Sequence, residues 1–215
     1  MQLRIDLHCH TLASYDCKTS LEAVVLACQH NKIDVLAITD HNEIWAAQKL
    51  AALGLANPQF IVGEEVYTNQ GEIIGLFLQE KIARGQSPEH TLAEIHEQGG
   101  LALLPHGFDH LKPSTLKAVA RERIKASLDI IEAFNGHTAQ ARSNHHALVW
   151  ATSHGLPISG GSDAHRAADI GSVYLETTDT IIKTPMDLLE ALKGGKIIGR
   201  RRNPILSFLR EQFPA

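Results

Sequence analysis

Short apolar segments that end in metal-binding side chains recur along this chain of 215 residues, and they restrict its fold more than any other feature. The first segment leads into Asp6-Leu7-His8-Cys9-His10. Residues two apart on a strand point to the same face, so His8 and His10 can bind one metal ion together. Similar segments end in Thr39-Asp40-His41, Gly63-Glu64-Glu65, Leu104-Pro105-His106 and Gly160-Gly161-Ser162-Asp163-Ala164-His165. The recurrence predicts strands whose ends bring metal ligands to one place.

Strand-like and helix-like segments alternate between these motifs. Strands are expected at residues 3–7, 35–39, 60–63, 72–78, 101–104, 129–134, 157–160, 173–177 and 197–198. Helices are expected at residues 20–31, 43–53, 87–98, 138–154 and 185–192. The alternation predicts an α/β fold with a largely parallel sheet, and functional residues at strand ends are typical of a β/α barrel. No linker or low-complexity run interrupts it, so we expect one domain over residues 1–215.

Histidine is unusually frequent, with 13 of the 215 residues, whereas Phe, Trp and Tyr together make up only 5% of the chain. Because histidine is the commonest metal ligand among side chains, this excess supports a metal site. The net charge of −4 argues against nucleic acid as a partner. The three cysteines (Cys9, Cys17 and Cys28) are expected to be reduced packing residues in a cytoplasmic protein. The sequence shows no secretory leader and no apolar stretch near the roughly 20 residues of a membrane helix, so no membrane association is expected.

The ordered motifs resemble the PHP (polymerase and histidinol phosphatase) domain family, a group of metal-dependent phosphoesterases. The resemblance extends from Leu3 to about Thr177. It implies a distorted (β/α)7 barrel with the metal site at the C-terminal ends of the strands. It also implies two or three divalent transition metals, and mixed histidine and carboxylate ligands suit Zn, Fe or Mn.

The resemblance also assigns the ligands to individual ions. The first ion would be bound by His8, His10, Glu65 and Asp163. The second would be bound by Asp16, His41 and His165, and a third by Glu65 and His106. Asp6 and Asp40 are expected to orient neighbouring histidines.

The sequence departs from the family pattern in two places. Many members follow the fourth-motif histidine with proline, whereas His106 precedes Gly107. Members with three metals carry a further histidine just before the strand at 129–134, and residues 123–128 contain none. His137, just past that strand, is an alternative ligand for a third ion, and a two-metal site remains open.

The implied reaction is hydrolysis of a small phosphate ester, a phosphomonoester or nucleotide, by a metal-bound hydroxide. Asp163, His165 and Arg166 are the predicted catalytic residues. Arg166 is the first candidate for binding the substrate phosphate and Arg142 the second. Protonation of the leaving group by His165, His41 or water remains open, as does a role for Arg200-Arg201-Arg202 as a phosphate clamp or a solvated end.

Two other readings compete with this one. A barrel metallohydrolase acting on C–N bonds commonly uses a modified lysine that bridges two metals, and no lysine lies among the motifs. A non-catalytic or accessory PHP domain linked to nucleic-acid metabolism tends to lose ligands, whereas nearly all are kept here. A nuclease would need a basic groove, which the net charge does not indicate. Neither the substrate nor the oligomeric state follows from the sequence.

Overall fold

The computed structural model of the protein describes residues 2–178 and 181–201. The strands are β1 (Gln2–Asp6), β2 (Val35–Ile38), β3 (Gln59–Thr68), β4 (Gly71–Leu76), β5 (Leu101–Leu104), β6 (Ile130–Asn135), β7 (Ile158–Gly161), β8 (Val173–Thr178) and β9 (Lys196–Gly199). The helices are α1 (Leu21–Asn31), α2 (Trp45–Ala51), α3 (Pro88–Glu97), α4 (Ala118–Ile124), α5 (Ala141–His154) and α6 (Pro185–Lys193), with 3-10 turns η1 (Lys125–Ser127) and η2 (Ala167–Asp169). Among these described residues, no helix is long and apolar enough to span a bilayer.

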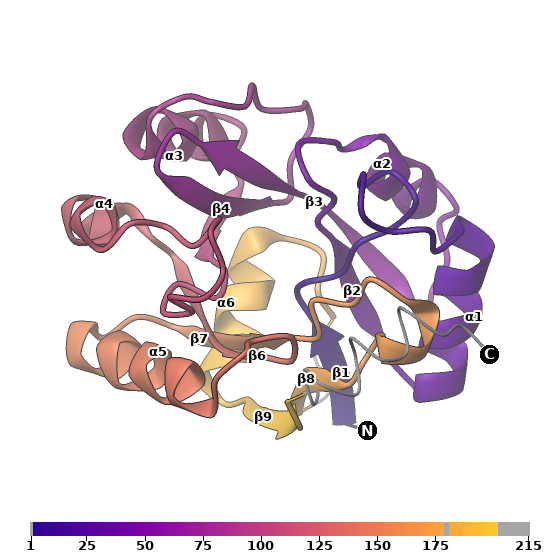
Figure 1. Ribbon diagram of the computed structural model, residues 1–215. Helices are drawn as coiled ribbons and strands as arrows, with labels where there is room; N and C mark the ends of the chain where they lie inside the picture. Colours follow the sequence, from indigo (N-terminus) through magenta and orange to yellow (C-terminus); the bar gives the residue numbers. More distant parts are fainter. Residues whose placement is uncertain (1, 179–180, 202–215) are drawn as a thin grey trace.

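The strands form one sheet in the order β7-β6-β5-β4-β3-β2-β1-β8-β9, with helices α1 to α5 around its outside (Figure 1). The segments that follow β1 and β7 meet and nearly close this sheet. The Asp163 N–H donates to the His8 carbonyl at 2.9 Å, and the His10 N–H donates to the Ala164 carbonyl at 3.0 Å. Seven strands therefore form a distorted barrel, while β8 and β9 continue from the start of β1 as a side sheet. The predicted barrel is confirmed.

Three apolar clusters hold the strands and helices together. One fills the barrel, where Ile5, Ala37 and Ile74 pack with Leu188 and Leu192 of α6, so this helix covers the apolar interior. A second lies between β4–β7 and the helices α3, α4 and α5, and a third between β2, β3 and the helices α1 and α2. Since burial of apolar area is the main favourable term in folding, these clusters fix the rim of the barrel on which the polar motifs lie.

The structure corrects three sequence predictions. The strand expected at 60–63 extends over Gln59–Thr68, because its second half pairs with β4 in a hairpin. Helix α4 was not expected, since the segment Ala118–Ile124 is short and lacks a side-chain cap. The sheet is not largely parallel: β4 runs antiparallel to both of its neighbours, and β8 runs antiparallel to β1.

Candidate metal centre

The predicted ligands gather at one end of the barrel, and four of them form a buried inner set. These four are His8, His10, Glu65 and Asp163, which we call the inner set, and each is at most 1% exposed. The nitrogen Nε2 of His8 lies 3.1 Å from Nε2 of His10, 3.5 Å from Glu65 Oε2 and 3.4 Å from Asp163 Oδ1. The His10 Nε2 atom lies 3.4 Å and 3.3 Å from the same two oxygens.

These separations fit a single tetrahedral ion. Ligand atoms about 2.0–2.1 Å from a tetrahedral centre lie about 3.3 Å from one another. Within the described residues, neither Glu65 Oε2 nor Asp163 Oδ1 accepts a hydrogen bond, although both atoms are buried. Because a buried carboxylate oxygen without a partner is costly, both atoms fit a bound cation.

The partners of the other ring nitrogens leave both Nε2 atoms free to bind metal. The Nδ1 atom of His8 lies 3.0 Å from Glu132 Oε1, and Nδ1 of His10 lies 3.1 Å from Ser14 Oγ. The Ser14 hydroxyl itself donates to Asp40, so it accepts from His10. With Nδ1 as the donor in each ring, two Nε2 lone pairs face each other, an arrangement that a cation stabilises.

The pKa values of His8 and His10 also indicate that a positive charge is favoured at this site. Burial alone lowers the pKa of His8, but the carboxylates of Asp163, Glu132 and Glu65 outweigh it and raise that pKa well above its ordinary value. Burial and the nearby His165 lower the pKa of His10 to about 3. One positive charge is therefore favoured between the two rings, and a proton competes with a metal ion for that place.

Three further predicted ligands form an outer set nearer the surface: Asp16, His41 and His165, of which His41 is buried. Asp16 Oδ2 lies 3.4 Å from His41 Nε2 and 3.3 Å from His165 Nε2. The Asp16 side chain is 33% exposed and that of His165 is 17% exposed. The ring of His137 lies beside that of His165, with the centroids 5.5 Å apart. The outer set can hold a second ion that solvent reaches, with His137 at its edge.

A third group of ligand atoms includes Glu72, which sequence reasoning missed. His41 Nδ1 lies 3.1 Å from Glu65 Oε2 and 3.4 Å from Glu72 Oε1, while His106 Nε2 lies 2.9 Å from Glu65 Oε1 and 3.4 Å from Glu72 Oε2. Both Glu72 oxygens are buried without a hydrogen-bond partner among the described residues. Burial and the charge of Glu65 raise the pKa of Glu72, a penalty that a cation between the carboxylates would remove.

Two of the predicted ligands have strained backbones, and one glycine permits close approach. Asp163 has φ +51° and His106 has φ +30°, values that are uncommon outside glycine and asparagine. Such residues cluster at functional sites. A Cβ atom on Gly161 would lie 2.3 Å from Glu132 Oε1 and 2.5 Å from the Cβ of His8, so only glycine fits there.

Of the two carboxylates predicted to orient neighbouring histidines, Asp40 does so and Asp6 does not. Asp40 supports His10 through Ser14, in line with its predicted role. Asp6 does not contact a histidine ring; it accepts backbone N–H groups of His8, Ser162 and Gly171 at the closure of the barrel. The ring of His8 is held instead by Glu132 of β6, whose signal in the sequence is a lone carboxylate within an apolar strand.

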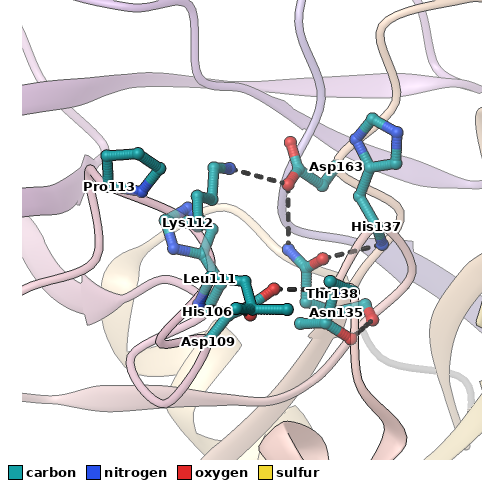
Figure 2. Close-up of a pocket in the computed structure, with 10 residues that line it drawn as sticks. His106, Asp109, Leu111, Lys112, Pro113, Asn135, His137, Thr138 and Asp163 are labelled. Atoms are coloured by element: carbon teal, nitrogen blue, oxygen red, sulfur yellow. Dashed lines mark hydrogen bonds and ion pairs between the residues drawn. The ribbon is translucent and has the colours of Figure 1, made fainter. Parts of the chain in front are cut away.

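Within the described residues, neither predicted phosphate-binding arginine forms a hydrogen bond or ion pair with the ligand side chains. Arg166 is exposed at the start of η2, and Arg142 is exposed with its guanidinium on Gln140. Arg201 donates to the carbonyls of Thr138 and Ala139, and Arg202 lies outside the described residues. The cation that the structure does bring to the cluster is Lys112, with Nζ 3.1 Å from Asp163 Oδ2 (Figure 2).

Comparison with known sequences matches two family descriptions. The PHP domain matches residues 6–156, and a PHP-associated region matches residues 141–197. An uncharacterized protein of Methanocaldococcus jannaschii is 34% identical over 190 residues, which cover 86% of this chain and 75% of that protein. A second from the same organism is 34% identical over 157 residues, covering 68% and 90% of the two chains.

Solved structures share the fold at low identity. A two-domain protein from Bacteroides vulgatus, described as containing a predicted PHP-like metal-dependent phosphoesterase, has a TM-score of 0.71 at 17% identity; the match covers 93% of this chain but 65% of that one. An amidohydrolase from Chromobacterium violaceum has a TM-score of 0.63 at 18% identity, covering 91% and 97%. A lesion-specific endonuclease from Pyrococcus furiosus has a TM-score of 0.60 at 14% identity, covering 92% and 58%. These matches and the donor set support a metal-dependent hydrolase.

Proposed function

This chain belongs to the PHP domain family, and from that membership and its site we propose that it is a metal-dependent phosphoesterase acting on a small phosphate ester. The observation that carries the proposal is the inner set, where two Nε2 lone pairs and two unpartnered carboxylate oxygens converge at 3.1–3.5 Å. Mixed histidine and carboxylate ligands suit Zn, Fe or Mn.

The metals would supply charge neutralisation at phosphorus and a water of lowered pKa. The residues of the chain position that chemistry. Glu65 directs one oxygen toward the inner histidines and the other toward His106, so it can serve two neighbouring ions. His165 Nδ1 lies 3.0 Å from the Asp163 carbonyl, which fixes the ring and turns Nε2 toward Asp16 at the surface. With Nδ1 as the donor to this carbonyl, the Nε2 lone pair of His165 would be left for the second ion.

A hydrolase acting on C–N bonds is the second candidate, because an amidohydrolase is among the structures of the same fold. In the scheme with a bridging lysine, the lysine side chain lies between two metal ions. Here Glu65 would hold the bridging position, since its two oxygens face different histidines, and Lys112 contacts the outer oxygen of Asp163 instead. The ligand arrangement therefore favours the phosphoesterase.

A small substrate remains our proposal rather than a nucleic acid, since the net charge is −4. The accessory-domain reading is disfavoured by the eight predicted ligands, which all lie in one cluster with Glu72. The expected cytoplasmic location and the single domain over residues 1–215 stay predictions.

The test is metal analysis of protein purified without added metal, followed by a phosphate-release screen over phosphomonoesters, nucleotides and dinucleotides. We expect at least two transition-metal ions per chain and release from a small ester. Less than one ion per chain after reconstitution would refute the metal centre. Full metal content with release of amine from amides, and no release of phosphate, would favour the C–N hydrolase.

A further inference from the structure

Lys112 lies where the metal centre opens into two adjoining hollows. One, of about 280 Å³, is lined by His106, Asn135 and Asp163 as well as by Lys112 and His137 (Figure 2). The other, of about 510 Å³, shares Lys112 and His137 and is also lined by Tyr15, Asp16, His41, Tyr67 and His165. Lys112 therefore borders two of the spaces through which a substrate could reach the ligands.

The Lys112 ammonium lies directly beyond the inner set. Asp163 directs Oδ1 toward the inner histidines and Oδ2 toward Nζ of Lys112 at 3.1 Å. An ammonium has three N–H donors, and within residues 2–178 and 181–201 Asp163 is its single hydrogen-bond partner. Two donors thus remain for a group that enters from the hollows, where the Lys112 side chain is 28% exposed.

The loop that carries Lys112 is held in place before any ligand arrives. The Lys112 N–H donates to the Asp109 carbonyl at 3.0 Å, and the Thr115 hydroxyl donates to the same carbonyl at 2.8 Å. The Asp109 carboxylate accepts the N–H of Ala139 at 2.9 Å, which ties the loop to the segment after β6. A positive charge fixed in this way binds an anion without first ordering its loop.

The other basic candidates do not compete for this position. Neither Arg166 nor Arg142 lines either hollow, and Arg201 is engaged by backbone carbonyls. An anion that reaches the inner and outer sets would therefore meet Lys112 before any arginine named above.

We propose that Lys112 binds the phosphate group of the substrate, holding its non-bridging oxygens at the mouth of the metal centre. The proposal rests on the phosphoesterase function proposed above and assigns to Lys112 the role that the sequence suggested for Arg166. The ammonium acts as a point charge with several donors, which suits a phosphate that changes shape during transfer. Lys112 thereby supports both substrate affinity and the charge that develops at phosphorus.

The test is binding of inorganic phosphate to metal-loaded protein by calorimetry, with metal content measured on the same samples. Lys112→Met keeps an unbranched side chain of similar length and removes its charge, and we expect phosphate to bind at least about 10-fold more weakly, as for loss of one charge-assisted contact. Lys112→Arg should recover part of the affinity. The matched control is Lys117→Met, at the exposed end of the same loop, which should bind phosphate like the parent.

Each outcome decides the question. Parent and Lys112→Met proteins that bind phosphate equally, or a parent that binds none, would overturn the proposal. The proposal would also fail if the Lys112→Met protein binds phosphate weakly but excess metal restores the binding, because Lys112 would then act only by supporting Asp163. If the parent binds phosphate through Lys112 but hydrolyses no phosphate ester, the phosphate site stands and the proposed function fails.

Discussion

The inner and outer sets of the metal centre use similar side chains in very different surroundings. Inner-set residues are at most 1% exposed, whereas in the outer set Asp16 is 33% and His165 is 17% exposed while His41 is buried. In the inner set, His8 and His10 are each held by a buried partner, Glu132 and Ser14. Among the described residues, the Asp16 carboxylate is held only by the two histidines with which it would share a metal.

Buried and exposed ligands at one end of the barrel can combine tight metal binding with access for substrate. Ligands whose orientation is fixed before binding lose little freedom when a cation arrives, and buried carboxylates gain most from its charge. Exposed ligands bind more weakly but let solvent and substrate reach the ion. We therefore expect the inner ion to be retained and the outer ion to exchange, and four experiments test this contrast.

Removal of all metal should have the largest effect. The inner set would then leave buried carboxylate oxygens facing each other without a cation, and activity should be lost. Binding at a thousandfold excess over Kd stabilises a protein by about 4 kcal/mol, or roughly 10 °C in Tm for a chain of this size. Thermal unfolding with and without a chelator measures this effect. If metal-free protein unfolds at the same temperature as the loaded protein, the inner set does not bind an ion tightly.

Asp163→Asn should have the next largest effect, because it removes a charge from the inner set while keeping the side-chain shape. Activity should fall at least roughly 100-fold, as expected when the support of a metal centre is disrupted. Metal analysis should show loss of one ion, and chelation should change the Tm of this variant much less than that of the parent. Near-normal turnover with full metal content would show that Asp163 is not a ligand.

Asp16→Asn should have a smaller effect that added metal reverses. The outer ion loses its one carboxylate ligand but keeps His41 and His165, so we expect about a 10- to 50-fold loss of activity. Millimolar metal in the assay should restore most of it, whereas Asp163→Asn should not recover. Titration of activity against metal concentration makes this comparison. Equal recovery of both variants would mean that the two sets do not differ in affinity.

The sequence predicts the barrel and most of this centre because the relevant signals are local. Each motif couples a strand-forming run with the ligand at its end, so the spacing of His8 and His10, or of Asp163 and His165, is readable without the fold. The place of Glu72 in the centre cannot be predicted from local spacing, because it depends on the hairpin register that pairs Glu72 with Tyr67. The loop of Lys112 depends on a hydrogen bond that the Ala139 N–H donates to the Asp109 carboxylate, 30 residues away.

Glu64→Gln should have the smallest effect on function, and it serves as a reference for buried carboxylates outside both sets. Glu64 and Glu65 are neighbours on β3, both fully buried, and their side chains point to opposite faces of the strand. Histidines around Glu65 lower its pKa well below the ordinary value despite burial. Glu64 has no such partners and accepts one N–H, from Ile82 at 2.8 Å, so burial raises its pKa from 4.5 to about 7.

The raised pKa gives Glu64 a defined effect on stability. Between pH 4.5 and about 7 the folded state keeps a proton that the unfolded state releases, so this stabilising contribution is present below pH 4.5 and is lost as the pH rises through 7. Glutamine has no proton to lose, so relative to the parent Glu64→Gln should gain roughly 1–3 kcal/mol across this range. Urea unfolding of both proteins, free of metal, at pH 5 and pH 8 measures the difference. Metal content and activity of the loaded variant should equal those of the parent, and a loss of either would place Glu64 in the metal centre.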